Sequence, residues 1–265
     1  MTTAMAGAQA SAAQSPGVLS LVLLHSKFNI LETMRIPIAV VGNLLFPTLA
    51  MFFFVVPQES VASDPVIATA AVGQLAMFSV MSTFLFTFGT GVAEDRALPF
   101  DAYVRTLPAG ATPRLVGRVL TGCVFALVSL IPLALVGWIF TEATITFPRL
   151  LLGIVTTLGV GLPFLMLGLA IGYRLSSKAA LAIVQVVLFP LAFAGGLFLP
   201  AEMFPNWLNL FSSVLPSRAG RDLLIQVLTG LDAYPMAPLV LLAWGVLFSL
   251  LAVLAYRRDE GRRFR

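Results

Sequence analysis

The sequence predicts an all-α membrane protein with six transmembrane helices and shorter amphipathic helices outside them. Of the 265 residues, 59% are hydrophobic and only 11% are charged, whereas soluble domains are about 25% charged. The mean hydropathy is +0.98. Apolar runs without ionisable residues recur along the chain, and each is long enough to cross a bilayer core of about 30 Å. Because backbone groups in lipid must bond within their own segment, the runs are expected to be helices.

Each predicted span is an apolar run of roughly 20 residues, the length that a membrane-crossing helix requires. The uncharged first 16 residues, rich in Ala, Ser, Thr and Gln, are expected to be disordered, and residues 17–265 to form a single membrane domain. The spans are predicted at about 36–56, 66–92, 119–140, 150–173, 179–199 and 237–256.

Residues 17–35, before the first span, are predicted to form an interfacial helix. Leu21, Leu24, Phe28 and Leu31 recur at helical spacing beside a polar stripe that includes His25. Such a helix lies in the membrane surface rather than across it.

The basic residues predict that both termini are cytoplasmic. With this orientation only Arg149, Arg218 and Arg221, among 16 Lys and Arg residues, fall on the outer side. Lys and Arg in short loops favour the cytoplasmic side of a membrane. The net charge of +4 is therefore explained by membrane orientation, and no nucleic-acid partner is expected.

Several chemistries are excluded or disfavoured. Cys123 and His25 are the only Cys and His residues, which rules out a disulfide framework and a Cys or His metal centre. The sequence lacks the phosphate-binding pattern GxxxxGK[ST] and the hydrolase patterns HExxH and GxSxG. The predicted span interiors offer no titratable base for a membrane-embedded enzyme. No catalytic or metal-binding residue is predicted, so energy for transport must come from elsewhere or the protein moves nothing uphill.

The longest inner loop, residues 94–118, mixes both charge signs with apolar and aromatic side chains. It is interpreted either as a short amphipathic helix presented to a partner or as a solvated loop whose arginines fix topology. A topology loop needs fewer residues, which favours a docking element.

The outer segment 200–230 is too apolar for a hydrated loop and too interrupted by proline to span. A re-entrant or interfacial helical hairpin satisfies both observations. Trp207 in this segment is also explained as an interfacial anchor.

Polar side chains inside the spans have two explanations, helix packing or the wall of a cavity for an amphipathic solute. The candidate cavity residues are Asn43, Gln74, Ser79, Thr83, Thr87 and Gln185. Glycines in the fourth span (Gly153, Gly159, Gly161 and Gly168) indicate close packing, and Pro190 with Gly195-Gly196 indicates a kink in the fifth.

The outer segment carries the most specific pattern in the chain, GGLFLPAEMFPNWLNLFSSVLPSRAGRDLL at 195–224. It resembles the stretch before the last span of type-2 ABC export permeases, in which a Gly-rich span end leads to a Pro, an FPxWL turn, an LP pair and a later Arg. The matching residues are Gly196, Pro200, Pro205, Trp207, Leu208, Leu215, Pro216 and Arg221. Glu94-Asp95-Arg96, followed by Leu107-Pro108, resembles the family's coupling loop but lacks its usual early glycine.

The resemblance implies the transmembrane subunit of an exporter for drugs, lipids or other hydrophobic or amphipathic solutes, in the plasma membrane. A second half, identical or paralogous, would complete the pathway. A separate ATP-binding subunit would hold ATP and Mg, and this chain would bind no cofactor. The residues implied to couple to the ATPase are Glu94, Asp95, Arg96, Phe100, Asp101, Tyr103 and Arg105. The alternative is a membrane scaffold or sensor subunit that transports nothing.

Overall fold

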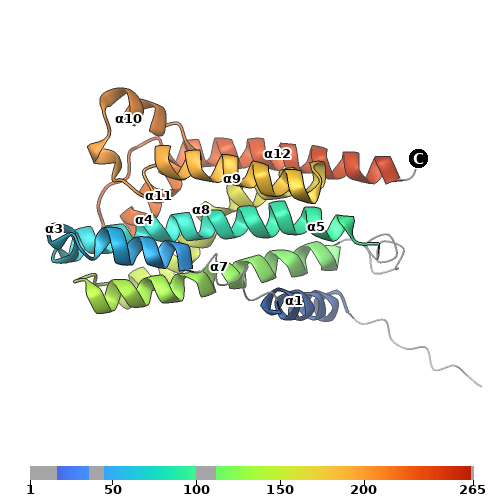
Figure 1. Ribbon diagram of the computed structural model, residues 1–265, viewed down its shortest axis with the longest axis horizontal. Coiled ribbons are helices and arrows are strands. Elements are labelled where there is room, and N and C mark those ends of the chain that lie inside the picture. Colours follow the sequence, from blue (N-terminus) through green and yellow to red (C-terminus); the bar gives the residue numbers. More distant parts are fainter. Residues whose placement is uncertain (1–16, 36–44, 100–111, 264–265) are drawn as a thin grey trace, which may run out of the picture.

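The computed structural model describes residues 17–35, 45–99 and 112–263, and within them every regular element is a helix. The long helices run side by side as one elongated bundle (Figure 1). Helix α1 (Val18–Met34), the end of α5 (Gly91–Ala97) and the C-terminal end of α12 (Ala237–Arg263) lie at one end of the bundle, here named the α1 end. Helices α3 (Glu59–Ala62) and α10 (Asn206–Ser212) lie at the opposite end, named the α10 end.

Five helices within the described residues are long and apolar enough to cross a membrane. They are Pro65–Ala97, Leu115–Phe140, Phe147–Arg174, Ser177–Ala194 and Ala237–Asp259. The predicted span at 36–56 is described only in part, as the shorter apolar helix Leu45–Val55, which ends in the π-helix η1 (Met51–Val55). Residues 36–44 lie outside the described residues, so the six-span prediction stays a prediction.

The first complete span is a continuous rod of three elements: α4 (Pro65–Phe84), the π-helix η2 (Leu85–Thr90) and α5. Asp64 begins it, because its Oδ1 accepts hydrogen bonds from the backbone N–H of Val66 and Ile67 at 2.8 and 2.9 Å. Pro65 occupies the first turn, where no backbone N–H is needed.

This rod is the centre of the bundle. Large side chains along it are fully buried, including Met77, Met81, Phe84 and Phe88. It packs against α7 (Thr112–Phe140), α8 (Phe147–Arg174) and α11 (Pro216–Thr229). A polar side chain on α4 is therefore enclosed by neighbouring helices, whereas α9 (Ser177–Ala194) and α12 keep apolar outer faces.

Glycines let α8 approach the central rod closely. A Cβ at Gly168 would lie 2.9 Å from the carbonyl oxygen of Phe84, and one at Gly172 would meet the carbonyl oxygens of Phe88 and Gly89. The close-packing prediction is wrong for Gly159, because a Cβ there would have no atom within 4 Å. Gly159 faces open space on the outside of the bundle, so no neighbour requires its small size.

The prediction that the fifth span continues to residue 199 is also wrong. Helix α9 ends at Ala194, and Gly196 has φ +74°, a left-handed conformation that stops a helix and that glycine adopts without strain. The Oγ of Ser217 bonds to the carbonyl oxygen of Leu191 at 2.6 Å and holds this end of the helix. The glycine pair therefore terminates the helix instead of kinking it.

The outer segment folds into three short pieces at the α10 end, namely η3 (Ala201–Met203), α10 and α11. Pro205 precedes the first residue of α10, and Pro216 is the first residue of α11. Helix α11 ends at Gly230, whose φ of +86° forms a left-handed cap. Prolines thus begin the helices and a glycine ends the last one, as their backbone preferences dictate.

Candidate coupling and transport site

The charged triplet Glu94-Asp95-Arg96 occupies the last turns of α5, directly before the loop toward α7. Glu94 is exposed, while Asp95 and Arg96 are half-buried. The apolar Leu98 that follows is 52% exposed. The triplet therefore presents one charge outward and directs the next two toward the bundle.

Arg96 binds two other helices of the same chain. Its Nε donates to Oδ1 of Asp259 on α12 at 3.1 Å, and its Nη2 forms an ion pair with the same carboxylate. Its Nη1 donates to the carbonyl oxygens of Gly172 and Leu175, at 2.6 and 3.2 Å, where α8 ends. One guanidinium thus joins the ends of α5, α8 and α12.

Asp95 turns to a different helix and forms an ion pair with Arg118 on α7. At the residue directly before this arginine, Gly117, helix α1 packs closely against α7. The Oγ of Ser26 donates to the carbonyl oxygen of Gly117 at 3.0 Å, and a Cβ at Gly117 would lie 2.9 Å from the Cβ of His25. The start of the loop is therefore fixed to α7, which in turn is fixed to α1.

The remaining residues implied to couple to an ATPase lie outside the described residues. They are Phe100, Asp101, Tyr103 and Arg105. Their roles stay predictions.

Two of the candidate cavity residues bond to neighbouring helices. The Oε1 of Gln74 accepts from Nε and Nη2 of Arg221 at 3.3 and 3.2 Å. The Oγ of Ser79 donates to the Oγ of Ser129 on α7 at 2.7 Å. Both side chains are buried in the single chain.

The other candidate cavity residues are scattered. Thr83 is buried, and its hydroxyl has no hydrogen-bond partner among the described residues. Thr87 in η2 is half-buried, and Gln185 is exposed on α9. Asn43 lies outside the described residues. A single chain thus does not gather the candidates around one space.

Arg221 is the centre of a charged cluster at the α10 end. Its side chain is 5% exposed, and its Nη1 donates to Oδ1 of Asp222 at 2.7 Å. Its Nη2 lies 3.2 Å from Oε2 of Glu202. Arg218 closes the cluster by donating from Nε to Oδ2 of Asp222 at 2.6 Å. Arg221 therefore connects the outer segment to Gln74 on the central rod.

The cluster changes the acidity of Glu202. Partial burial raises the pKa of this carboxyl, but the positive charge and hydrogen bond of Arg221, a backbone hydrogen bond and the charge of Arg218 together outweigh burial, so the pKa lies below its usual range. Burial, with the nearby negative charge of Asp222, raises the pKa of Tyr234 to about 12. The hydroxyl of Tyr234 donates to the carbonyl oxygen of Ser213 at 2.8 Å.

Trp207 and its neighbours form the apolar surface of the outer segment. Trp207 is 70% exposed and Leu210 is 75% exposed. Pro200 directly precedes η3. On the inner side of the segment, Nε1 of Trp244 on α12 donates to the carbonyl oxygen of Val214 at 2.8 Å.

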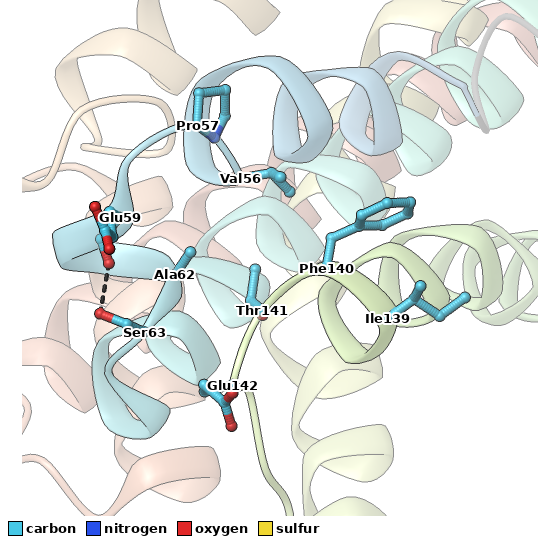
Figure 2. A pocket seen from close by; sticks show the side chains of 9 residues that line it. All are labelled: Val56, Pro57, Glu59, Ala62, Ser63, Ile139, Phe140, Thr141 and Glu142. Carbon is cyan, nitrogen blue, oxygen red and sulfur yellow. Dashed lines mark hydrogen bonds between the residues drawn. The ribbon is translucent and has the colours of Figure 1, made fainter.

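A pocket of about 360 Å³ opens at the α10 end, between the turn after η1 and the end of α7. Figure 2 shows Phe140 and Ile139 on the α7 side, with Pro57 and Glu59 on the other. Its lining contains none of the candidate cavity residues. In the described part of the chain no group of three or more His, Cys, Asp or Glu side chains is placed to hold a metal ion.

Sequence reasoning missed Asp259, Asp222 and Glu202 as partners of the two central arginines. Asp259 and Glu260 follow Arg257 and Arg258 in an otherwise basic tail, so this acidic pair was the available signal. The spacing gives no indication of pairing, because Arg96 and Asp259 lie 163 positions apart.

Comparison with known proteins identifies the family. The model of the family described as "ABC-2 type transporter" matches residues 21–229, from α1 to the end of α11. The chain belongs to this family of transmembrane permease subunits. It is also 26% identical over 223 residues to "Putative transport permease YvfS" of Bacillus subtilis (strain 168), covering 83% of this chain and 91% of the relative. Membership makes it a transmembrane transport subunit of a lipid bilayer, and the family implies an ABC ATP-binding partner.

Proposed function

We propose that the chain is the transmembrane subunit of an ATP-driven exporter in the plasma membrane. It moves a hydrophobic or amphipathic solute out of the cytoplasm or the inner leaflet. ATP and Mg bind to the partner subunit, and this chain binds no cofactor. The uncharged interiors of the apolar helices support an apolar or amphipathic solute, and the family supports the ATP-binding partner.

The α1 end of the bundle faces the cytoplasm in this proposal. The end of α5, the start of α7 and the C-terminal end of α12 are close to this end (Figure 1). Lys and Arg residues concentrate in the same segments, as they do on the cytoplasmic side of membrane proteins. Helix α1 then lies in the inner interface, with Leu19 and Phe28 exposed toward lipid.

The anchored start of the loop after α5 is the observation that carries the docking role. Ion pairs fix Asp95 to α7 and Arg96 to α12, and hydrogen bonds to backbone carbonyls fix Arg96 to α8, so force on the loop reaches three helices. The ATP-binding subunit docks on the residues that follow. Phe100 and Tyr103 supply an apolar anchor, and Glu94, Asp101 and Arg105 supply the charged rim.

A second half, the same chain or a paralogue, completes the pathway. The apolar outer faces of α9 and α12, including Val186 and Leu242, are available to lipid or to this second half. Gln185 is exposed on α9 between apolar neighbours. A polar amide on an otherwise apolar outer face is better satisfied in a hydrated pathway between two halves than in lipid.

The experiment that tests the docking role replaces both Phe100 and Tyr103 with Asp in a C-terminally tagged chain. The unsubstituted chain is expected to co-purify with an ATP-hydrolysing subunit, and the double variant to insert normally but lose it. The control is Asp232→Lys, which changes the charge of an exposed position in the loop before α12 by the same magnitude in the opposite direction, and it should retain the subunit. Full retention by the Phe100/Tyr103 variant would overturn docking on this loop. A native preparation without any ATPase would favour the scaffold or sensor alternative.

A further inference from the structure

The contact between Arg96 and Asp259 assigns a role to the cytoplasmic end of the last helix. Asp259 is the last residue of the apolar stretch of α12, and its side chain is only 3% exposed. Its Oδ1 receives both the Nε and the Nη2 of Arg96. The third nitrogen of the guanidinium, Nη1, donates hydrogen bonds to the carbonyl oxygens of Gly172 and Leu175. Arg96 therefore directs all three of its nitrogens into its own chain.

An apolar cluster next to this ion pair joins the same three helices. Val92 on α5, Tyr173 on α8 and Ala255 on α12 are buried against one another. The rings of Tyr173 and Tyr256 meet edge to face with centroids 5.1 Å apart. The ends of α5, α8 and α12 thus form one packed unit, which we name the cytoplasmic junction.

Helix α12 extends from the junction to the opposite end of the bundle (Figure 1). There Nε1 of Trp244 donates to the carbonyl oxygen of Val214, two residues before the start of α11. The contact between α12 and α8 is the most extensive of any helix pair among the described residues. A displacement of α12 at the junction is therefore transmitted to the outer segment through a rigid helix.

We propose that Asp259 is a positioning residue for ATP-driven transport. It holds Arg96 so that movement of the loop after α5 displaces α8 and α12 together. This inference rests on the proposed function, because the moving loop is the one on which the ATP-binding subunit docks. A buried carboxylate keeps its cationic partner strongly, since separating them leaves a charge unpaired in an apolar site. The planar guanidinium binds the carboxylate and the two carbonyls at the same time in a fixed geometry that the compact ammonium group of lysine does not reproduce.

The test measures nucleotide-dependent hydrogen–deuterium exchange of residues 200–230 in the full chain, purified with its ATP-binding subunit. Exchange is compared with ADP and with ATP plus vanadate. In the unsubstituted complex the two nucleotide states should differ in this outer segment. In Asp259→Asn and in Arg96→Gln the difference should be lost while the partner stays bound and hydrolyses ATP. The double variant should lose no more than either single variant, because the two residues act as one unit.

Two variants serve as controls. Arg258→Gln changes the adjacent, exposed residue of α12 and should keep the full difference between nucleotide states. Asp259→Glu retains the negative charge and should restore most of it. If the neutral variants fail to reach the membrane, Asp259→Glu is compared with Arg96→Lys instead. Arg96→Lys should lose more of the nucleotide-dependent difference in exchange than Asp259→Glu does.

Three results would overturn the inference. A full nucleotide-dependent difference in Asp259→Asn would show that the contact does not transmit movement. Loss of the ATP-binding subunit from that variant would place Arg96 or Asp259 in the docking surface instead. An unsubstituted complex that binds its partner but shows no difference would also overturn it. A chain that binds no ATP-hydrolysing partner at all would refute the proposed function itself, and the mass of the co-purifying proteins distinguishes this case.

Discussion

Gln74 and Arg221 are hydrogen-bonded across 147 positions of the chain, with Oε1 of Gln74 accepting from two nitrogens of the guanidinium. The glutamine belongs to the central helix α4 and the arginine to α11 in the outer segment. Both are buried. The outer segment is therefore fixed to the core of the bundle by a polar contact, in addition to its apolar packing.

Removing Arg221 should destabilise the protein more than removing Gln74. Arg221→Met leaves Asp222 with Arg218 as its remaining ion-pair partner and is expected to cost about 3 kcal/mol. Gln74→Leu leaves Arg221 bonded to Asp222 and Glu202 and is expected to cost about 1 kcal/mol. Thermal unfolding in one detergent measures the order of the two variants. Equal unfolding temperatures would show that the charged cluster does not depend on Arg221.

Stability at the α10 end should depend on pH through Glu202. Its pKa is lower in the folded protein than its ordinary value, so its stabilising contribution is fully present above the ordinary pKa. The contribution is lost as the pH falls through the folded pKa. The unfolding temperatures of the native chain and of Glu202→Gln should therefore differ at neutral pH and converge in acid. In an Arg221→Met background the substitution should have little effect at any pH, and a persistent difference there would contradict the assignment.

Two glycines of α8 should respond oppositely to alanine. Gly172→Ala places a Cβ against the carbonyl oxygens of Phe88 and Gly89, and is expected to cost roughly 1–3 kcal/mol because backbone must move. Gly159→Ala meets no atom within 4 Å and should be neutral or stabilising by up to about 1 kcal/mol through helix propensity. Unfolding temperatures measure both. A neutral Gly172→Ala would contradict the close contact between α8 and η2.

The proposed pathway predicts two classes of labelling by a water-soluble thiol reagent in a Cys123→Ala background. Cysteines at Thr87 and Gln185, whose side chains are accessible in the single chain, should react in every transport state. Cysteines at Gln74, Ser79 and Thr83 are enclosed and should react only when α4 separates from its neighbours during the ATP cycle. Protection of all five positions in every state would favour helix packing over a cavity.

The local features of this fold could be predicted from sequence, because the length of an apolar run and the position of a proline determine the structure of the segment that contains them. Apolar runs predicted the spans after the first, and the prolines in the outer segment predicted a broken helical structure. The left-handed Gly196 at the end of α9 was interpreted as part of a kink, since sequence alone does not give the sign of a backbone dihedral angle.

Long-range partners could not be predicted in the same way. Arg96 was assigned with Glu94 and Asp95 to one coupling surface, because adjacent charges in a sequence do not reveal which of them turns inward. Arg221 was recognised from the outer motif and Gln74 from its position in a span, yet their contact required the packing of α11 against α4. These contacts arise from the arrangement of whole helices.

The most direct test of the proposed ATP-driven exporter is the mass of the complex that the native, tagged chain forms in mild detergent, measured together with its ATPase activity. We expect two transmembrane halves with two ATP-binding subunits, and ATP hydrolysis by the purified assembly. A monomer without ATPase activity, obtained under conditions that preserve other membrane complexes of the same cells, would contradict it.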